Sequence, residues 1–130
     1  MRQLISSGSP LEPEIGFSRA VRIGNTLAVS GTAPIAENGA VSSPGSVYGQ
    51  TKRCLEIASK AIRDGGFAVA DVIRTRVMLT DVSKWKEAAQ AHGEFFAGVR
   101  PACTFVEVSR FIDSEWLVEV ELDCVAETNI

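Results

Sequence analysis

Hydrophobic and polar residues alternate along two stretches near the end of the chain, residues 100–109 and 117–126. Successive side chains of a β-strand point to opposite faces of a sheet, so both stretches are predicted to be strands. In the second stretch the apolar residues share one face: Val118, Val120, Leu122 and Cys124. The opposite face carries three carboxylates: Glu119, Glu121 and Asp123. Like charges this close are costly in a dry site, so this face is expected to meet solvent or a polar cavity.

Three more strands are predicted upstream: residues 17–23, 26–30 and 72–80. Gly24-Asn25 is a turn signal that joins the first two strands as a hairpin. In the third strand, Ile73 and Thr75 are expected on the same face as the other alternate apolar residues. Residues 1–14, which contain two prolines, are expected to form an extended lead-in.

Two stretches with helical spacing of apolar residues lie between the strands: residues 46–64 and 84–96. Cys54 falls on the apolar stripe of the first helix and is interpreted as core. Asp81 and Ser83 are candidate caps for the second helix, whose apolar stripe includes Trp85 and His92. The order β-β-α-β-α-β-β requires crossovers and partly parallel pairing. We predict a single α+β domain over residues 1–130, a two-layer sandwich with both helices on one face of a mixed sheet.

The chain has 130 residues, of which 45% are hydrophobic and 22% charged, as expected for one globular domain. No apolar run approaches the roughly 20 residues that cross a membrane, and the first residues lack the apolar core of a secretion signal. Three cysteines without metal-ligand spacing favour a reduced, cytoplasmic protein with no bound metal.

The net charge of −3, with basic residues scattered along the chain, weighs against nucleic-acid binding, which depends on clustered Lys and Arg. The sequence contains no phosphate-binding loop, dinucleotide fingerprint or metalloprotease motif. No cofactor and no membrane partner are therefore expected.

The motif Arg100-Pro-Ala-x-x-x-Val-Glu-Val-x-Arg110, followed by Val-Glu-Val-Glu at 118–121, resembles the signature of the Rid family of reactive intermediate deaminases, also called YjgF. Four upstream segments extend the likeness over most of the chain: Val77-Met-Leu-Thr-Asp81, Gln50-Thr51, Ser30-Gly31-x-x-Pro34 and Gly16-Phe-Ser-x-Ala-Val21. The resemblance implies a chorismate-mutase-like fold and a homotrimer with its sheets inside. It also implies small-molecule sites in the clefts between subunits.

Rid enzymes hydrolyse enamines and imines such as 2-aminoacrylate, and their signature arginine directly after Pro-Ala holds the substrate carboxylate. Cys103 occupies this position here, and a thiol cannot form the two-pronged pair of a guanidinium with a carboxylate. The chain therefore resembles a subgroup that lacks the arginine, and 2-aminoacrylate is not expected to be its substrate. Arg100 is a candidate replacement anion holder; the alternative is a surface charge at the start of a strand.

The resemblance implies roles for other positions. Glu119 matches the pocket glutamate that positions a water molecule or relays a proton. Phe17 falls where the family usually has tyrosine, and Ser30 and Gly31 match the strand end that lines the cleft. Ala89 replaces a common asparagine, so another polar contact is lost.

Cys103 and His92, which stands where the family commonly has tyrosine, are also a candidate catalytic pair. An adjacent imidazolium lowers the pKa of a thiol and makes it nucleophilic. The alternatives are a half-buried strand cysteine and a structural histidine on a buried helix face.

Three functional hypotheses follow from this resemblance. The first is a hydrolase of an imine, an enamine or a related small metabolite that uses Glu119 and water. The second is a non-catalytic trimer that binds a small molecule. The third is an endoribonuclease, an activity of some family members, which the acidic composition makes the weakest of the three.

Overall fold

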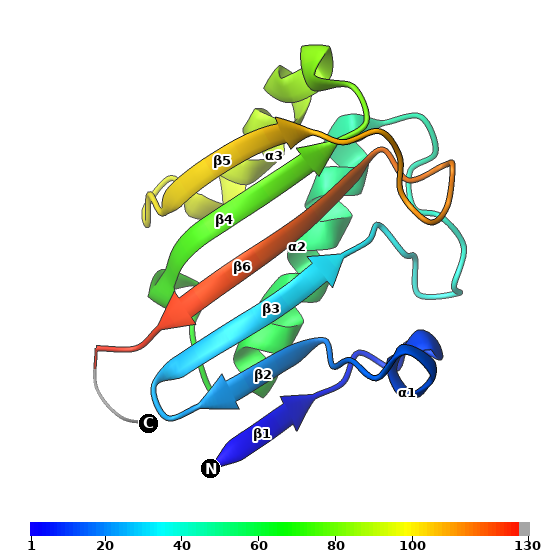
Figure 1. The fold of residues 1–130 in the computed structure, drawn as a ribbon. Coiled ribbons are helices and arrows are strands. Elements are labelled where there is room, and N and C mark those ends of the chain that lie inside the picture. Colours follow the sequence, from blue (N-terminus) through cyan, green and yellow to red (C-terminus); the bar gives the residue numbers. More distant parts are fainter. Residues whose placement is uncertain (128–130) are drawn as a thin grey trace.

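The computed structural model describes residues 1–127 and contains a six-stranded mixed sheet with two main helices on one face (Figure 1). The strand order is β1-β2-β3-β6-β4-β5. The strands are β1 (Arg2–Ile5), β2 (Ala20–Ile23), β3 (Thr26–Thr32), β4 (Val72–Leu79), β5 (Ala102–Glu107) and β6 (Val118–Val125). Only the β4–β5 pair is parallel among the strand pairs of residues 1–127. The predicted α+β fold is confirmed.

Both predicted helices are present as α2 (Val47–Asp64) and α3 (Trp85–Phe96), and they pack behind the sheet in Figure 1. Ser46 caps α2, because its hydroxyl accepts a hydrogen bond of 3.0 Å from the backbone N–H of Gly49. The predicted stripe of α2 faces the sheet, and Cys54 within it is buried. Two short 3₁₀ helices, η1 (Val69–Asp71) and η2 (Val82–Lys84), precede β4 and α3.

The extended lead-in predicted for residues 1–14 is wrong. Residues 2–5 form the edge strand β1, which pairs antiparallel with β2, and Leu11–Ile15 form the short helix α1. The strand buries Ile5 in the core, whereas its other residues are exposed. One buried residue in a four-residue strand is too short a pattern to be recognised as alternation.

Two predicted side-chain positions also need correction. Ile73 was expected to face the helices, but it is 51% exposed and Val72 is buried in its place. The cause is an irregularity in the β4–β6 pairing between Val72 and Arg74, which shifts the alternation by one residue. Trp85 was expected on the buried stripe of α3, but it stands at the first position of that helix and is 45% exposed.

The two faces of β6 have the predicted character. Its alternate apolar residues are buried beneath the helices, and Glu119, Glu121 and Asp123 lie on the opposite, open face of the sheet. The carboxylates of β6 can therefore contact a ligand only on the open face of the sheet. Within residues 1–127, no helix combines the length and the apolar character needed to cross a membrane.

Candidate functional site

The three carboxylates of β6 have different partners on the open face. Glu121 forms an ion pair of 2.8 Å with Arg76, and Asp123 lies 3.8 Å from Arg74. Glu119 stands opposite Met78 and forms no hydrogen bond or ion pair with any of the residues 1–127. Arginines of β4 therefore compensate two of the three carboxylates, and Glu119 is the carboxylate that no arginine of β4 pairs with.

Burial raises the pKa of Glu119, and the neighbouring carboxylate of Glu121 adds to this effect, whereas Arg19 opposes it. Gly31 leaves room for the side chain, since a Cβ at this position would lie 3.0 Å from Glu119 Oε1. Glu119 is thus a half-buried carboxylate whose lone pairs remain free within the described chain. Such a group is suited to accept and return a proton near neutral pH.

Gly31 lies beside Glu119, and Arg19 connects this glycine to two other predicted site residues, Phe17 and Ser30. The guanidinium carbon of Arg19 is 5.4 Å from the centre of the Phe17 ring. Its Nη1 donates hydrogen bonds to Ser30 Oγ at 3.1 Å and to the Gly31 carbonyl at 2.7 Å. We call these five residues the Glu119 group: Phe17, Arg19, Ser30, Gly31 and Glu119.

Sequence reasoning missed Arg19, which is only 8% exposed. It occupies the unspecified position of the Gly-Phe-Ser-x-Ala-Val motif, and a lone charged residue in a predicted strand is normally on the surface. No local pattern signalled its burial, because adjacent residues of an extended chain point to opposite sides and the contacts of Arg19 are made with β3 and Ser7.

Cys103 and His92 lie elsewhere, at the β5 edge of the sheet. Cys103 is the register partner of Thr75, and Thr75 also pairs with Leu122 on the helix-covered face. His92 Nε2 is 2.8 Å from Thr75 Oγ1, so cysteine, threonine and histidine share one side of this edge. We call Cys103, Thr75 and His92 the edge group. It lies on the face opposite to Glu119.

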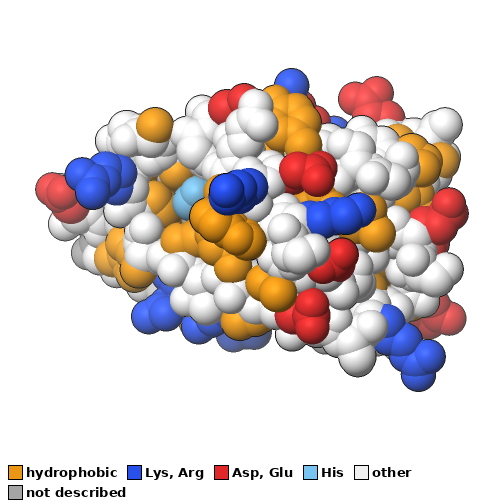
Figure 2. Space-filling model, turned by 90° about the horizontal axis from the view of Figure 1, so that it is seen from above, with side chains coloured by type: hydrophobic (Ala, Val, Ile, Leu, Met, Phe, Trp, Pro, Cys, Tyr) orange, Lys and Arg blue, Asp and Glu red, His pale blue; other side chains and the backbone are white. Residues whose placement is uncertain are grey.

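The edge group does not support a thiolate–imidazolium pair. Burial lowers the pKa of His92, so its ring is neutral at neutral pH, and Nε2 is already bonded to Thr75. The ring also packs 4.7 Å from the Phe96 ring, centre to centre. Figure 2 shows the pale-blue histidine reaching the surface among hydrophobic side chains. Cys103 is exposed and not half-buried as expected, because β5 is an edge strand.

Arg100 is exposed between the end of α3 and the start of β5, and its backbone is left-handed with φ of 56°. β5 enters the sheet where Ala102 pairs with Arg74, whereas Glu119 pairs with Met78. Four residues along β4 correspond to roughly 13 Å. Within one chain, therefore, Arg100 lies far from the carboxylate that it was expected to assist.

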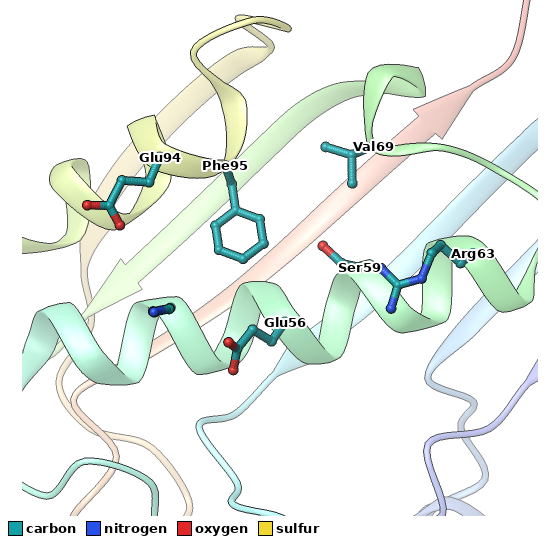
Figure 3. Close-up of a pocket in the computed structure, with 7 residues that line it drawn as sticks. Glu56, Ser59, Arg63, Val69, Glu94 and Phe95 are labelled. Carbon is teal, nitrogen blue, oxygen red and sulfur yellow. The ribbon is translucent and has the colours of Figure 1, made fainter.

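A groove of about 510 Å³ lies between α2 and α3 on the helical side of the molecule (Figure 3). Phe95 points from α3 toward α2, above Glu56 and Ser59 of that helix. Lys52 and Arg63 also line the groove, so its charges are mixed. None of the predicted site residues lines it. Within residues 1–127, no three His, Cys, Asp or Glu side chains are grouped as metal ligands would be.

Comparison with known proteins gives consistent matches. Residues 8–127 match the family described as endoribonuclease L-PSP. The Streptomyces coelicolor protein SCO2049 is 40% identical over 119 residues, which are 92% of this chain and 88% of that protein. The 3-aminoacrylate deaminase RutC of Acinetobacter baylyi is 27% identical over 117 residues, which are 90% of this chain and 91% of that protein.

The fold also matches a crystal structure closely. Rv2704 of Mycobacterium tuberculosis, a member of the YjgF/YER057c/UK114 family, superposes with a TM-score of 0.88 at 37% sequence identity. The superposition covers 97% of this chain and 100% of that one.

Proposed function

Because the chain belongs to the endoribonuclease L-PSP family, also called the YjgF or Rid family, we propose that it hydrolyses small imines or enamines. The observation that carries this proposal is the state of Glu119. It is the only one of the three β6 carboxylates without an ion pair within residues 1–127. Burial also raises its pKa. A carboxylate in this state can exchange protons with water and with a leaving amine.

The proposed reaction converts a C=N bond and one water molecule into a C=O bond and ammonia. Glu119 takes a proton from the water as the water oxygen bonds to the imine carbon, and it passes this proton to the nitrogen to give a carbinolamine. Glu119 then takes the hydroxyl proton and gives it to the amino group, so that the C–N bond breaks and ammonia leaves as the C=O bond forms. An enamine first becomes the imine by gaining a proton on carbon and losing one from nitrogen. Glu119 ends the cycle in the state in which it began.

We place the reaction in a cleft between two subunits of a homotrimer. The Glu119 group and the edge group lie on opposite faces of one sheet, so one chain cannot direct both at the same ligand. A second copy can present its β5 edge to the Glu119 group of the first. Arg100 and His92 of that copy would then line the cleft, with Arg100 as the candidate anion holder.

Two facts narrow the substrate class. The relative RutC is named for 3-aminoacrylate, an enamine, which supports deamination of this type of compound. Cys103 stands in place of the carboxylate-binding arginine, so the substrate is expected to have no carboxylate at that position. We therefore do not propose 2-aminoacrylate as the substrate.

The test is hydrolysis of a panel of imines, some generated from amino acids and others from amines without a carboxylate, followed as loss of semicarbazide-trapped imine. Glu119→Gln keeps the shape of the side chain and removes its proton transfer, so it should abolish turnover. Glu121→Gln is the matched control on the same strand face, and it should retain most of the activity because Glu121 is paired with Arg76. Equal loss of activity in both variants would contradict the role of Glu119.

One observation favours a second candidate function, a non-catalytic trimer that binds a small molecule in the same cleft. The exposed Cys103 supplies no charge where the family's arginine stands. Under this alternative, the panel compounds or their keto products bind measurably by calorimetry and none is turned over. The family name also mentions RNA cleavage, but a net charge of −3 disfavours the phosphate backbone.

A further inference from the structure

Arg19 is held in place by an unusually complete set of contacts for a single arginine. Its Nη1 contacts three acceptors of β3: Ser30 Oγ, the Gly31 carbonyl and Thr32 Oγ1, the last at 3.1 Å. Its Nε donates to Ser7 Oγ at 3.2 Å, and the ring of Phe17 lies against the guanidinium. These contacts fix both the position and the plane of the guanidinium.

A second carboxylate supports Arg19 from the side of the N-terminal segment. Glu12 is buried, and its Oε2 accepts hydrogen bonds from Ser7 N at 3.0 Å and from Ser7 Oγ at 3.1 Å. The same Ser7 hydroxyl is the acceptor for Arg19 Nε. Burial acts to raise the pKa of Glu12, but hydrogen bonds from Ser6, Ser7 and Ser9 outweigh it and lower the pKa. Glu12 is therefore ionised at neutral pH and serves as a fixed counter-ion.

Glu119 is the other carboxylate near Arg19, and it is held differently. Its Oε1 lies close against Gly31, the residue whose carbonyl is bound to Arg19 Nη1. Nη2 takes part in none of the hydrogen bonds of Arg19 with residues 1–127. Nε and Nη1 of the guanidinium thus donate hydrogen bonds to the protein, whereas Nη2 retains N–H donors that no described residue accepts.

We propose that Arg19 is a positioning residue for Glu119: Glu12, Ser7 and β3 lock its guanidinium against Gly31, and its positive charge holds the Glu119 carboxylate, which packs against the same glycine. This inference rests on the proposed function for its catalytic meaning. The interaction between the charges of Arg19 and Glu119, however, does not depend on any substrate. It also gives Ser7 and Glu12 of the N-terminal segment a role, because these residues hold Arg19 in place.

The charges around Glu119 are few enough to identify. Arg19 lies on one side of it, and Glu121 follows on its own strand with Arg76 of β4 bound to it. Met78, the register partner of Glu119 on β4, is uncharged. Cys54 of α2 is also within electrostatic range, but burial raises the pKa of this thiol and keeps it neutral. Arg19 is therefore the positive charge that lowers the pKa of Glu119.

The first measurement uses the wild-type chain in its native assembly. Carbon-13 NMR gives the titration of the Glu119 carboxyl carbon, and nitrogen-15 NMR follows Nε of Arg19. We expect the Arg19 signal to shift with the same midpoint as Glu119, and this shift to disappear in Glu119→Gln. An Arg19 signal that stays constant across the Glu119 titration would overturn the proposal, and this arm needs no Arg19 variant to fold.

The second measurement compares Arg19→Gln with Arg22→Gln. Arg22 is a matched control, because its guanidinium also lies 5.4 Å from a phenyl ring, that of Phe67, and donates to the carbonyls of Gly24 and Gly65. Loss of an adjacent opposite charge raises a carboxyl pKa by about one pH unit or more, so Arg19→Gln should raise that of Glu119 by this amount. Arg22→Gln should leave it unchanged. No rise in a folded Arg19→Gln protein, or equal rises in both variants, contradicts the proposal.

If the chain proves to be a hydrolase, the acidic limb of its pH–rate profile should shift by the same amount as the pKa of Glu119 shifts in Arg19→Gln. In Arg19→Gln, kcat/KM should fall about tenfold at pH values below both pKa values and little above them. A purely structural role would lower activity equally at every pH. If no hydrolysis is found, the NMR titrations still decide the role of Arg19, so the two failures are distinguishable.

Discussion

At the residue scale, partners rather than spacing distinguish Glu119 from its neighbours. Glu119 and Glu121 are two residues apart on the same face of β6, and their sequence contexts are nearly identical. Arg76 stands opposite one and Met78 opposite the other. The carboxylate of Glu121 is occupied by its ion pair with Arg76, whereas the oxygens of Glu119 form no ion pair within residues 1–127. The register between β4 and β6 therefore decides which glutamate can act.

The raised pKa of Glu119 predicts a pH-dependent effect on stability. Below the ordinary glutamate pKa the side chain is protonated in both the folded and the unfolded state, and Glu119→Gln should change stability little. As the pH rises through the raised pKa of the folded state, burial of the ionised carboxylate costs stability. Glu119→Gln should then increase the free energy of unfolding at pH 7, measured by urea denaturation at fixed protein concentration. A difference of the same size at pH 4 and pH 7 would contradict this explanation.

The residue at position 103 is predicted to control the preference for carboxylate substrates. Cys103→Arg should raise turnover of 2-aminoacrylate by tens to thousands of fold, as expected for a charge-assisted anchor worth about 2–5 kcal/mol in a buried site. Cys103→Lys is the control, because it adds the charge without the two-pronged geometry and should gain less. A combined Cys103→Arg and Ala89→Asn variant tests whether the missing amide is also needed. High turnover by the wild-type chain would show that another residue, Arg100 first, holds the carboxylate.

At the scale of elements, α2 is the support of the whole sheet. Its buried stripe packs against the central strands, and its first turn is capped by Ser46. Gln50 of the same helix is fully buried and bonds both to the Glu115 carbonyl and to the Leu117 N–H. These bonds hold the chain just before β6, two residues ahead of Glu119. The helix thereby helps to set where the acidic face begins.

Ser46→Ala should lower the free energy of unfolding by about 1 kcal/mol, because the N–H of Gly49 loses its acceptor. Ser114→Ala, which changes an exposed serine in the segment before β6, is the control and should have almost no effect. Both can be measured by urea denaturation at the same protein concentration. Similar losses in the two variants would mean that the cap contributes nothing to α2.

At the scale of the whole molecule, the open face of the sheet has the exposed apolar residues of a subunit interface. The apolar residues on this face lie among its paired charges: Leu4, Val21, Ala28, Met78 and Val106. Leu4 is 63% exposed in the single chain. Exposed apolar surface of this kind is usually covered in a functional assembly.

We expect a homotrimer at micromolar concentration, measured by sedimentation equilibrium as three times the chain mass. Val106→Glu should dissociate it, because it adds a carboxylate to the row that already contains Glu119 and would bury an unpaired charge. Lys60→Glu, on the exposed side of α2, is the control and should leave the trimer intact. A stable wild-type monomer would refute the subunit cleft and, with it, the proposed site of reaction.

Periodicity alone determined most of the architecture. The five predicted strands and two helices are present, because the alternation of β6 and the apolar stripe of α2 are long enough to be unambiguous. Local turn chemistry was also readable at Gly24-Asn25. The predicted caps of the second helix were wrong, because Asp81 caps the 3₁₀ helix η2 and the N-cap of α3 is Lys84, which makes no side-chain hydrogen bond there. The missed elements, β1 and α1, are short, and β1 depends on its pairing with β2.

Only the tertiary structure decided how the candidate residues are grouped. Sequence spacing cannot show that Glu119 faces Met78, that Cys103 lies on the other face, or that Arg19 is buried beside Phe17. The register of β4, β5 and β6 sets the first two, and it depends on a pairing irregularity next to Ile73 that no local pattern encodes. The third depends on the N-terminal segment folding back over β3. The first two relations join residues 41 positions apart, Met78 and Glu119, and 28 positions apart, Thr75 and Cys103, and packing of the described chain is what brings them together.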